Sequence, residues 1–342
     1  GSSLVGSEMC IRDSVEGALV ADQATFFSSV VPETQGSHGQ GLWPGIVVEP
    51  GGQANLTETV VANASAGVLV RGAFNGTDVV FNDAYRGLSV MGGAAEVSGM
   101  EAHRMDYEAI YVASGTLHAN DVLAREVAVG LANHGQSNLT DLTVQEAGVG
   151  VQSQAGSMNL SGLNVHNASV GFATVSGAST LLDTFTGSGL ALAIDAGNAD
   201  DFSLGNENTL SGERFLVGQA VSSMDLQGVS FTASGVDTRP VMDVRCDGTC
   251  RLTQSAFDGP QVGLSWSGPG TSVMDNVAVN AVQQAVEASG SGHADWANLT
   301  VAASERVLTV QTPSSSIANV AVHLNSDDGR GIDVLGGEHV WS

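Results

Sequence analysis

The sequence feature that most restricts the fold is a repeat with a period of 20 to 26 residues. Each copy has a small residue, an apolar-x-apolar pair, a turn with glycine and an apolar-x-x-apolar-x-apolar triplet, as in the stretch Gly150–Val170. The apolar residues that head the copies form a first column: Ile46, Val68, Leu88, Ile110, Leu131, Val151, Phe172, Leu192, Leu216, Met242, Leu264, Val286, Leu308 and Ile332. A fixed period made of short alternating runs predicts strands that stack into a solenoid.

A second column, formed by the apolar triplets, predicts where the chain bends. The residue before the middle member of seven triplets is always Gly, Asn or Asp: Gly99, Asp141, Gly162, Gly228, Asn276, Asn298 and Asn319. These residue types tolerate a left-handed backbone, so a sharp corner is expected at each position. Strand, corner, strand and turn in succession predict a parallel β-helix, because the long stripes of period 3.6 typical of helical repeats are missing.

The ends of the chain differ from the repeats. The run from Leu4 to Asp13 resembles the translation of a transposase sequencing adapter, so residues 1–14 are interpreted as a non-native scar. Residues 15–44 are expected to form an irregular first coil and a loop, and residues 45–342 the repeats. The last residues, Trp341 and Ser342, follow a strand pattern without a polar cap, so we expect truncation at both ends.

One phrase near the start carries a family resemblance. Phe27-Ser28-Ser29 is followed by a polar loop, then by Trp43-Pro44-Gly45-Ile46 and by the pair Gly51-Gly52. The phrase resembles the surface-exposed right-handed β-helix proteins of the pectate-lyase-like superfamily. This resemblance implies an all-β fold over residues 15–342, a right-handed, single-stranded parallel β-helix of about 14 coils. It leaves function open, because the fold hosts lyases, hydrolases, adhesins and inert stalks.

The catalytic motifs of that superfamily are not filled in this sequence. Arg239-Pro240 is not followed by the arginine of the lyase pattern, and Asp200-Asp201 with Asn133-His134-Gly135 leaves the hydrolase pattern incomplete. An extracellular or cell-surface scaffold with weak glycan binding or adhesion is therefore favoured over catalysis. The alternative is a polysaccharide lyase or glycoside hydrolase whose motifs have diverged or lie outside this sequence.

Charge restricts the partners. The formal net charge is −25, and all eleven basic residues are arginines. Nucleic acids and anionic membranes attract basic surfaces, so neither is an expected partner. No apolar run reaches the length of a membrane span. The expected protein is a secreted or cell-surface monomer whose partner is a polysaccharide or a cell-surface glycan.

A group of aromatic and charged residues is the candidate ligand site. Its members lie near one another in the repeat: Tyr85, Arg86, Arg104, Tyr107, Glu108 and Tyr111. A step of 22 residues predicts that Tyr85 and Tyr107 stack on adjacent coils, about 4.8 Å apart. A sugar ring could stack on such tyrosines. The other interpretation is a solvated corner with a surface pair between Arg86 and Glu108.

Two further motifs suggest covalent or metal chemistry. In Cys246-Asp-Gly-Thr-Cys250 the tight turn could bring the thiols together, which predicts a disulfide in a secreted protein. The acidic stretch around Asp200, Asp201 and Glu207 offers oxygen ligands for Ca²⁺, although an ordinary polar loop explains it as well. No cofactor is expected otherwise.

Asn-x-Ser/Thr triplets recur along the chain. They begin at Asn55, Asn63, Asn75, Asn138, Asn159, Asn167 and Asn298. They are either N-glycosylation sites or chance products of a chain rich in turns.

Overall fold

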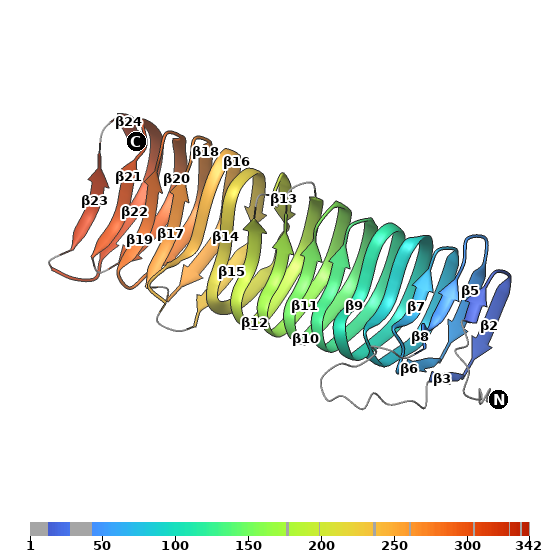
Figure 1. The fold of residues 1–342 in the computed structure, drawn as a ribbon. Coiled ribbons are helices and arrows are strands. Elements are labelled where there is room, and N and C mark those ends of the chain that lie inside the picture. Colours follow the sequence, from blue (N-terminus) through green and yellow to red (C-terminus); the bar gives the residue numbers. More distant parts are fainter. Residues whose placement is uncertain are drawn as a thin grey trace. The chain divides into compact units, whose positions relative to one another are not determined.

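The computed structural model describes residues 13–27, 43–175, 178–197, 199–234, 237–259, 261–303, 305–327, 329–335 and 337–341. The described residues form parallel strands and no helix, and the strands wind into a solenoid of about 13 turns (Figure 1). The parallel β-solenoid predicted from the repeat is confirmed. The chain divides into two compact units, residues 1–168 and residues 169–342, called unit 1 and unit 2 below.

Unit 1 is built from three parallel sheets. The first contains β1 (Asp13–Val15), β4 (Ile46–Val48), β7 (Ala66–Val70) and the start of β9 (Arg86–Asn133). The second contains β2 (Ala18–Asp22), β5 (Gln53–Thr57) and the start of β8 (Ala73–Ala84). The third contains β3 (Thr25–Phe27), β6 (Val60–Ala62) and the end of β8. β9 pairs with β8 and with β10 (Gln136–Ser153), and the pairing continues on both sides of the corner residues. β11 (Gly156–Thr174) begins in this unit.

Unit 2 continues the same plan with long strands and then short ones. The long strands are β12 (Ala178–Gly197), β14 (Asn208–Gln227) and β16 (Pro240–Asp258), with β13 (Asp201–Leu204) and β15 (Val229–Ala233) between them. On the start of β16 stack β17 (Val262–Ser267), β19 (Gln284–Ser289), β21 (Arg306–Gln311) and β23 (Arg330–Val334). On its end stack β18 (Thr271–Asn280), β20 (His293–Ala303), β22 (Ser314–Leu324) and β24 (Glu338–Trp341).

The corners lie where the sequence predicts them. All seven predicted corner residues have a positive φ, between 52° at Asn319 and 75° at Gly162. Gly99 and Gly162 have a second reason to be glycine, because a Cβ atom on either would collide with a carboxylate oxygen of Asp78 or Asp141 on the preceding rung. A second line of corner residues was not predicted from the sequence: Asp83, Arg104, Glu126 and Glu146 also have a positive φ.

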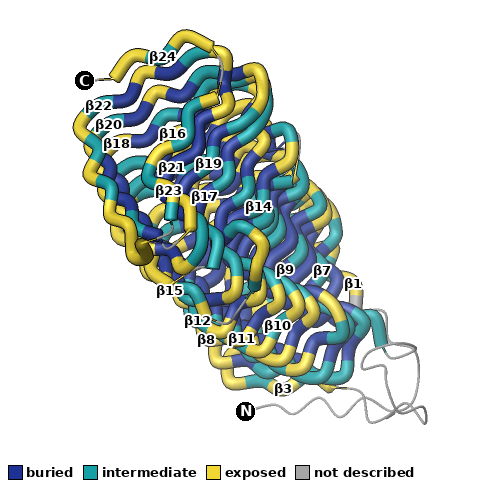
Figure 2. Tube along the Cα trace, turned by 90° about the vertical axis from the view of Figure 1, so that its left-hand side faces the viewer, coloured by how far each residue is buried: buried dark blue, intermediate teal, exposed yellow. Residues whose placement is uncertain are grey.

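The core is a stack of inward-facing side chains inside each unit. Inward and outward residues alternate along the strands, and Figure 2 shows them as rows of buried and exposed positions. In unit 1 the largest fully buried side chains include Phe74 and Phe81, and in unit 2 the ring of Phe215 lies 5.4 Å from that of Phe257. Burial of one such side chain contributes about 1.5–3 kcal/mol, so a stack of them holds the rungs together.

The predicted first column is wrong at one position. Ile194, and not Leu192, pairs with Leu216, which gives a step of 22 residues in place of 24. The stretch from Leu190 to Ile194 contains several apolar residues, so the apolar pattern alone did not select the one that heads the strand. The longest step, from Leu216 to Met242, is real, and its extra residues lie between β15 and β16.

The first described residues of the chain extend the first sheet. Asp13 and Ser14 belong to β1, where they pair with Ile46 and Val47, so the last two residues of the segment interpreted as a scar extend the first sheet. Residues 1–12 lie outside the described part of the chain, as do Ser28, Ser29 and the polar loop that follows. Within the described part, no helix has the length and apolar character needed to cross a membrane.

Candidate functional sites

The tyrosine ridge, defined as Tyr85, Arg86, Arg104, Tyr107, Glu108 and Tyr111, is built on β9 and the turn before it. The rings of Tyr85 and Tyr107 stack, with centroids 5.4 Å apart and planes inclined by 20°. The backbone N–H of Tyr107 donates to the carbonyl of Tyr85 at 3.0 Å, so the two residues hold equivalent positions on neighbouring rungs. The stack expected from the 22-residue step is therefore present.

The two rings of this stack differ in their exposure to solvent. The Tyr107 side chain is 46 % exposed, whereas Tyr85 is half-buried. The aromatic stack thus presents ring surface to solvent.

Arg86 contacts three tyrosine rings and one carboxylate. Its guanidinium carbon is 4.2 Å from the ring centroid of Tyr111, 5.5 Å from that of Tyr85 and 5.8 Å from that of Tyr107. Its Nε donates to Glu108 at 2.6 Å. Each ring contact is of the cation–π type, which contributes more where water is excluded.

The pair between Arg86 and Glu108 is not the surface pair that the sequence suggests. Glu108 is only 4 % exposed, because it is packed under the ridge with its carboxylate bound to the guanidinium. A pair removed from water contributes to a defined geometry, since loss of either partner leaves an uncompensated charge. Arg86 therefore acts as a support for the rings, and its guanidinium donates to both carboxylate oxygens of Glu108.

Arg104 is held away from the aromatic stack by a different carboxylate. Its Nε and Nη2 donate to the two carboxylate oxygens of Asp83 at 2.7 and 2.8 Å. This hydrogen-bonded contact raises the pKa of Arg104. Both side chains are partly exposed, so the pair is of the kind that contributes little to stability. The sequence indicates that Arg104 lies near the tyrosines. It does not show that the guanidinium of Arg104 is already bound to Asp83.

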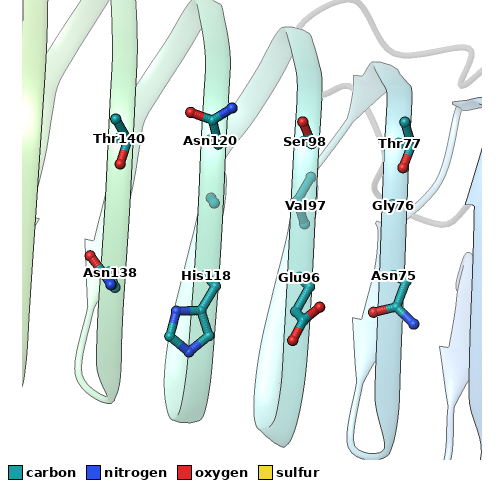
Figure 3. A pocket seen from close by; sticks show the side chains of 11 residues that line it. Asn75, Gly76, Thr77, Glu96, Val97, Ser98, His118, Asn120, Asn138 and Thr140 are labelled. Atoms are coloured by element: carbon teal, nitrogen blue, oxygen red, sulfur yellow. The ribbon is translucent and has the colours of Figure 1, made fainter.

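A second candidate site was missed by the sequence analysis. It is an open hollow of about 450 Å³ on the second sheet of unit 1, called the amide groove here. One wall is the outward column Asn75, Glu96, His118 and Asn138. The other is the column Thr77, Ser98, Asn120 and Thr140, two residues further along each strand (Figure 3).

The inward residues beneath the groove are smaller than those of the flanking rungs. Between the two walls the strands place Gly76, Val97 and Ala119 toward the core, whereas the flanking rungs place Leu56 and Leu139 there. The change in inward side-chain size is in step with the repeat and can be read from the sequence.

The Asn-x-Ser/Thr triplets of this sheet follow from the alternation of a strand. At Asn75 and Asn138 the asparagine and the threonine two residues later are exposed, and the residue between them is buried. A polar-apolar-polar strand therefore produces the triplet whether or not it is glycosylated. Asn75 donates from Nδ2 to Oδ1 of Asn55 on the preceding rung at 2.8 Å, so these amides form a ladder.

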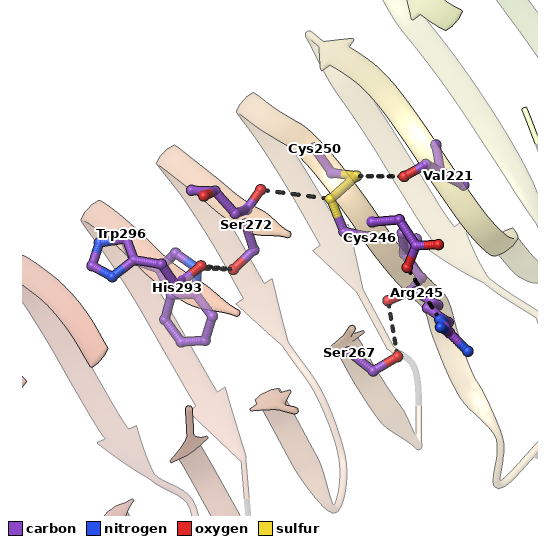
Figure 4. The surroundings of a disulfide bond; sticks show 11 residues. Val221, Arg245, Cys246, Cys250, Ser267, Ser272, His293 and Trp296 are labelled. Carbon is purple, nitrogen blue, oxygen red and sulfur yellow. Dashed lines mark hydrogen bonds and ion pairs between the residues drawn. A yellow bond between two sulfur atoms is a disulfide. The ribbon is translucent and has the colours of Figure 1, made fainter. Parts of the chain in front are cut away.

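The cysteines predicted to pair are joined in unit 2. Cys246 and Cys250 form a disulfide across the Asp-Gly turn of β16, with Cα atoms 6.1 Å apart (Figure 4). Both cysteines are buried, at 2 % and 0 % exposure. The bond closes a short loop, so its entropic contribution is modest and its main effect is to hold the turn against the core.

Among the described residues, no group of three or more acidic, histidine or cysteine side chains is placed to hold a metal ion. Of the acidic residues suggested as calcium ligands, Asp201 begins β13, and Glu207 lies beyond its end at a corner with a φ of 66°. The neighbouring Asn208 is buried and accepts from the backbone N–H of Phe185 at 2.7 Å, so it supports a corner of the fold.

Comparison with known proteins gives likeness of chain trace only. No family model matches the sequence, and no curated protein matches it. A GH87 α-1,3-glucanase catalytic unit from Streptomyces thermodiastaticus is similar at 16 % identity, over 92 % of this chain and 71 % of that one, with a TM-score of 0.39.

Two other solved structures are similar at lower identity. The periplasmic alginate epimerase AlgG has 9 % identity over 94 % of this chain and 85 % of its own, with a TM-score of 0.38. The Streptococcus pneumoniae surface protein and adhesin PfbA has 8 % identity over 95 % and 89 %, with a TM-score of 0.25. The function of this chain has to be derived from its own residues.

Proposed function

We propose that this protein is an extracellular scaffold that binds glycans through the tyrosine ridge without transforming them. The observation that carries the proposal is the stack of Tyr85 on Tyr107, with Tyr107 46 % exposed. A pyranose ring has an apolar C–H face that packs on an aromatic ring, while tyrosine hydroxyls and neighbouring donors contact its hydroxyl groups.

The support under the rings favours binding. Because Arg86 is bound to Glu108 and contacts all three tyrosine rings, the ring orientations are set before a ligand arrives. A preorganised surface loses little side-chain entropy when it binds. The ridge is an open wall, so we expect weak affinity for one sugar and tighter binding for a longer chain.

The carboxylates of the ridge favour binding over hydrolysis. Glycoside hydrolysis uses two carboxyl groups on either side of the scissile bond, one as a proton donor and one as a base or nucleophile. In the ridge, Glu108 is bound to Arg86 and Asp83 is bound to Arg104. Neither carboxylate is free to take a catalytic role, which supports a scaffold.

An extracellular setting is supported by the disulfide. Disulfides persist in oxidising compartments and are rare in the cytosol, and this chain joins Cys246 to Cys250. A net charge of −25 with no lysine also suits a soluble scaffold at a cell surface.

A glycan array followed by titration tests the proposal. We expect Tyr107→Ala to weaken binding about tenfold, equivalent to about 1.4 kcal/mol, because the exposed ring face is lost. Tyr107→Phe keeps the ring and serves as the matched control, so it should retain most of the affinity. Glycan binding that survives the double substitution Tyr85→Ala, Tyr107→Ala would place the site elsewhere.

A further inference from the structure

The outward column on one side of the amide groove changes its chemistry in the middle. Rungs on either side of the centre carry asparagine, at Asn75 and Asn138, whereas the two central rungs carry Glu96 and His118. Where asparagine follows asparagine, the side-chain amides bond to each other along the stack, as Asn75 does with Asn55. A carboxylate and an imidazole interrupt that ladder.

The interruption leaves polar atoms without a partner inside the protein. Neither Glu96 nor His118 makes a side-chain hydrogen bond or ion pair within the described part of the chain, and both are exposed over the hollow. The facing column adds Ser98 and Asn120 at the same two rungs (Figure 3). Four polar side chains therefore border one stretch of the open hollow and can bond to a ligand.

The kinds of group in the walls select a hydroxyl-rich ligand. Asparagine side chains and the hydroxyls of Ser98 and Thr140 both donate and accept hydrogen bonds, and Glu96 accepts. Sugar hydroxyls have the same dual character. The exposed walls carry no Phe, Tyr, Trp or large aliphatic side chain, so they lack the apolar centre typical of a protein–protein interface.

Charge selects an uncharged ligand. The groove lining contains no arginine, the chain contains no lysine, and the net charge of the protein is −25. The carboxylate of Glu96 lies in the wall itself. A polyanion would gain no ion pair here and would be repelled, because like charges in contact disfavour association.

The direction of the two columns favours an extended polymer as the ligand. Both columns run from rung to rung along the solenoid axis of unit 1, at about 4.8 Å per rung. An extended β-1,4-linked pyranose chain advances by slightly more than one rung for each sugar. Successive sugars can therefore meet successive rungs, and their weak contacts add along the chain.

We propose that the amide groove is a second ligand site, which takes an uncharged, extended polysaccharide along the axis of unit 1. Glu96 and His118 bind sugar hydroxyls at its centre, and Asn120 binds them from the opposite wall. The site lies on a different sheet from the tyrosine ridge and does not depend on the ridge binding a glycan.

Affinity electrophoresis in gels containing a soluble polysaccharide tests the site with two probes of one backbone. Hydroxyethylcellulose is a neutral β-1,4-glucan, and carboxymethylcellulose is its anionic counterpart. We expect the neutral probe to retard the wild-type protein and the anionic probe to have no effect. The double substitution His118→Ala, Asn120→Ala should weaken retardation by the neutral probe at least about tenfold.

Asn159→Ala is the matched control. Asn159 is exposed, follows Asn138 by one repeat in the sequence and is not among the residues that line the groove. It should bind like the wild type. All the substituted residues are exposed, so thermal unfolding should show the same Tm for every variant. No retardation of the wild type by hydroxyethylcellulose, or equal loss in Asn159→Ala, would overturn the inference.

The experiment distinguishes polysaccharide binding at the groove from binding at the tyrosine ridge. Retardation that is lost in Tyr85→Ala, Tyr107→Ala and kept in His118→Ala, Asn120→Ala would reject the groove and support the ridge. The reverse result would support the groove and reject the ridge as the site for this probe.

Discussion

The tyrosine ridge and the amide groove lie on the same rungs of unit 1 but are stabilised in different ways. In the ridge the charged groups are satisfied inside the protein, since Arg86 is bound to Glu108 and Arg104 to Asp83. In the groove Glu96 and His118 have no such partner among the residues that the structure describes. The ridge is thus a rigid aromatic surface coupled to folding, whereas the groove is a polar surface that folding leaves free for a ligand.

The largest expected loss of stability tests the alternation of inward and outward residues along β9, which separates the wall of the groove from the core. Leu117 is fully buried and His118, the next residue, is exposed in the groove. Leu117→Asp places a lone charge in the core and should cost more than about 4 kcal/mol of unfolding free energy. His118→Asp should change stability little. Chemical denaturation measures both, and equal losses would contradict the register of β9.

The next effect tests whether the ridge is coupled to folding and the groove is not. Glu108→Ala leaves Arg86 partly buried without its carboxylate and should lower the unfolding free energy by about 2–3 kcal/mol. The loss of unfolding free energy stays below that of a fully buried pair because the Arg86 side chain is 27 % exposed. Glu96→Ala, the control in the groove, should stay within about 0.5 kcal/mol of the wild type. Equal Tm values for the two variants would remove the distinction.

The smallest effect concerns the outer edge of the ridge. Asp83 and Arg104 are partly exposed, so their coupling should be about 0.5 kcal/mol in a double-mutant cycle with Asp83→Asn and Arg104→Gln. Added salt screens exposed charges, so this coupling should fall as ionic strength rises. A coupling of several kcal/mol that salt leaves unchanged would show that the pair is part of the buried support.

Much of the fold could be predicted because a solenoid repeats its contacts at a short distance in sequence. The corner residues are an example: each needs a left-handed backbone, which restricts it to few residue types, and all seven have a positive φ. The error at Leu192 shows the limit of this reasoning. Where Leu192 and Ile194 are both apolar and two residues apart, either could head the strand, and only the pairing with Leu216 decides.

The candidate sites were predictable in part for the same reason. The stack of Tyr85 on Tyr107 and the bond between Cys246 and Cys250 follow from spacing, because a fixed step or a tight turn sets the distance between two side chains. The amide groove does not follow from the spacing of polar residues alone. It depends on how the surfaces of four neighbouring rungs lie relative to one another.

The sequence by itself determined the period, one line of corners and many of the residues that lie side by side on neighbouring rungs. The tertiary structure decided which charges are used up within the protein: Glu108 is buried against Arg86, Asp83 binds Arg104, and Glu96 with His118 is left facing solvent. The physical reason is that a repeat specifies backbone neighbours, whereas burial and hydrogen bonding depend on how side chains from several rungs pack together.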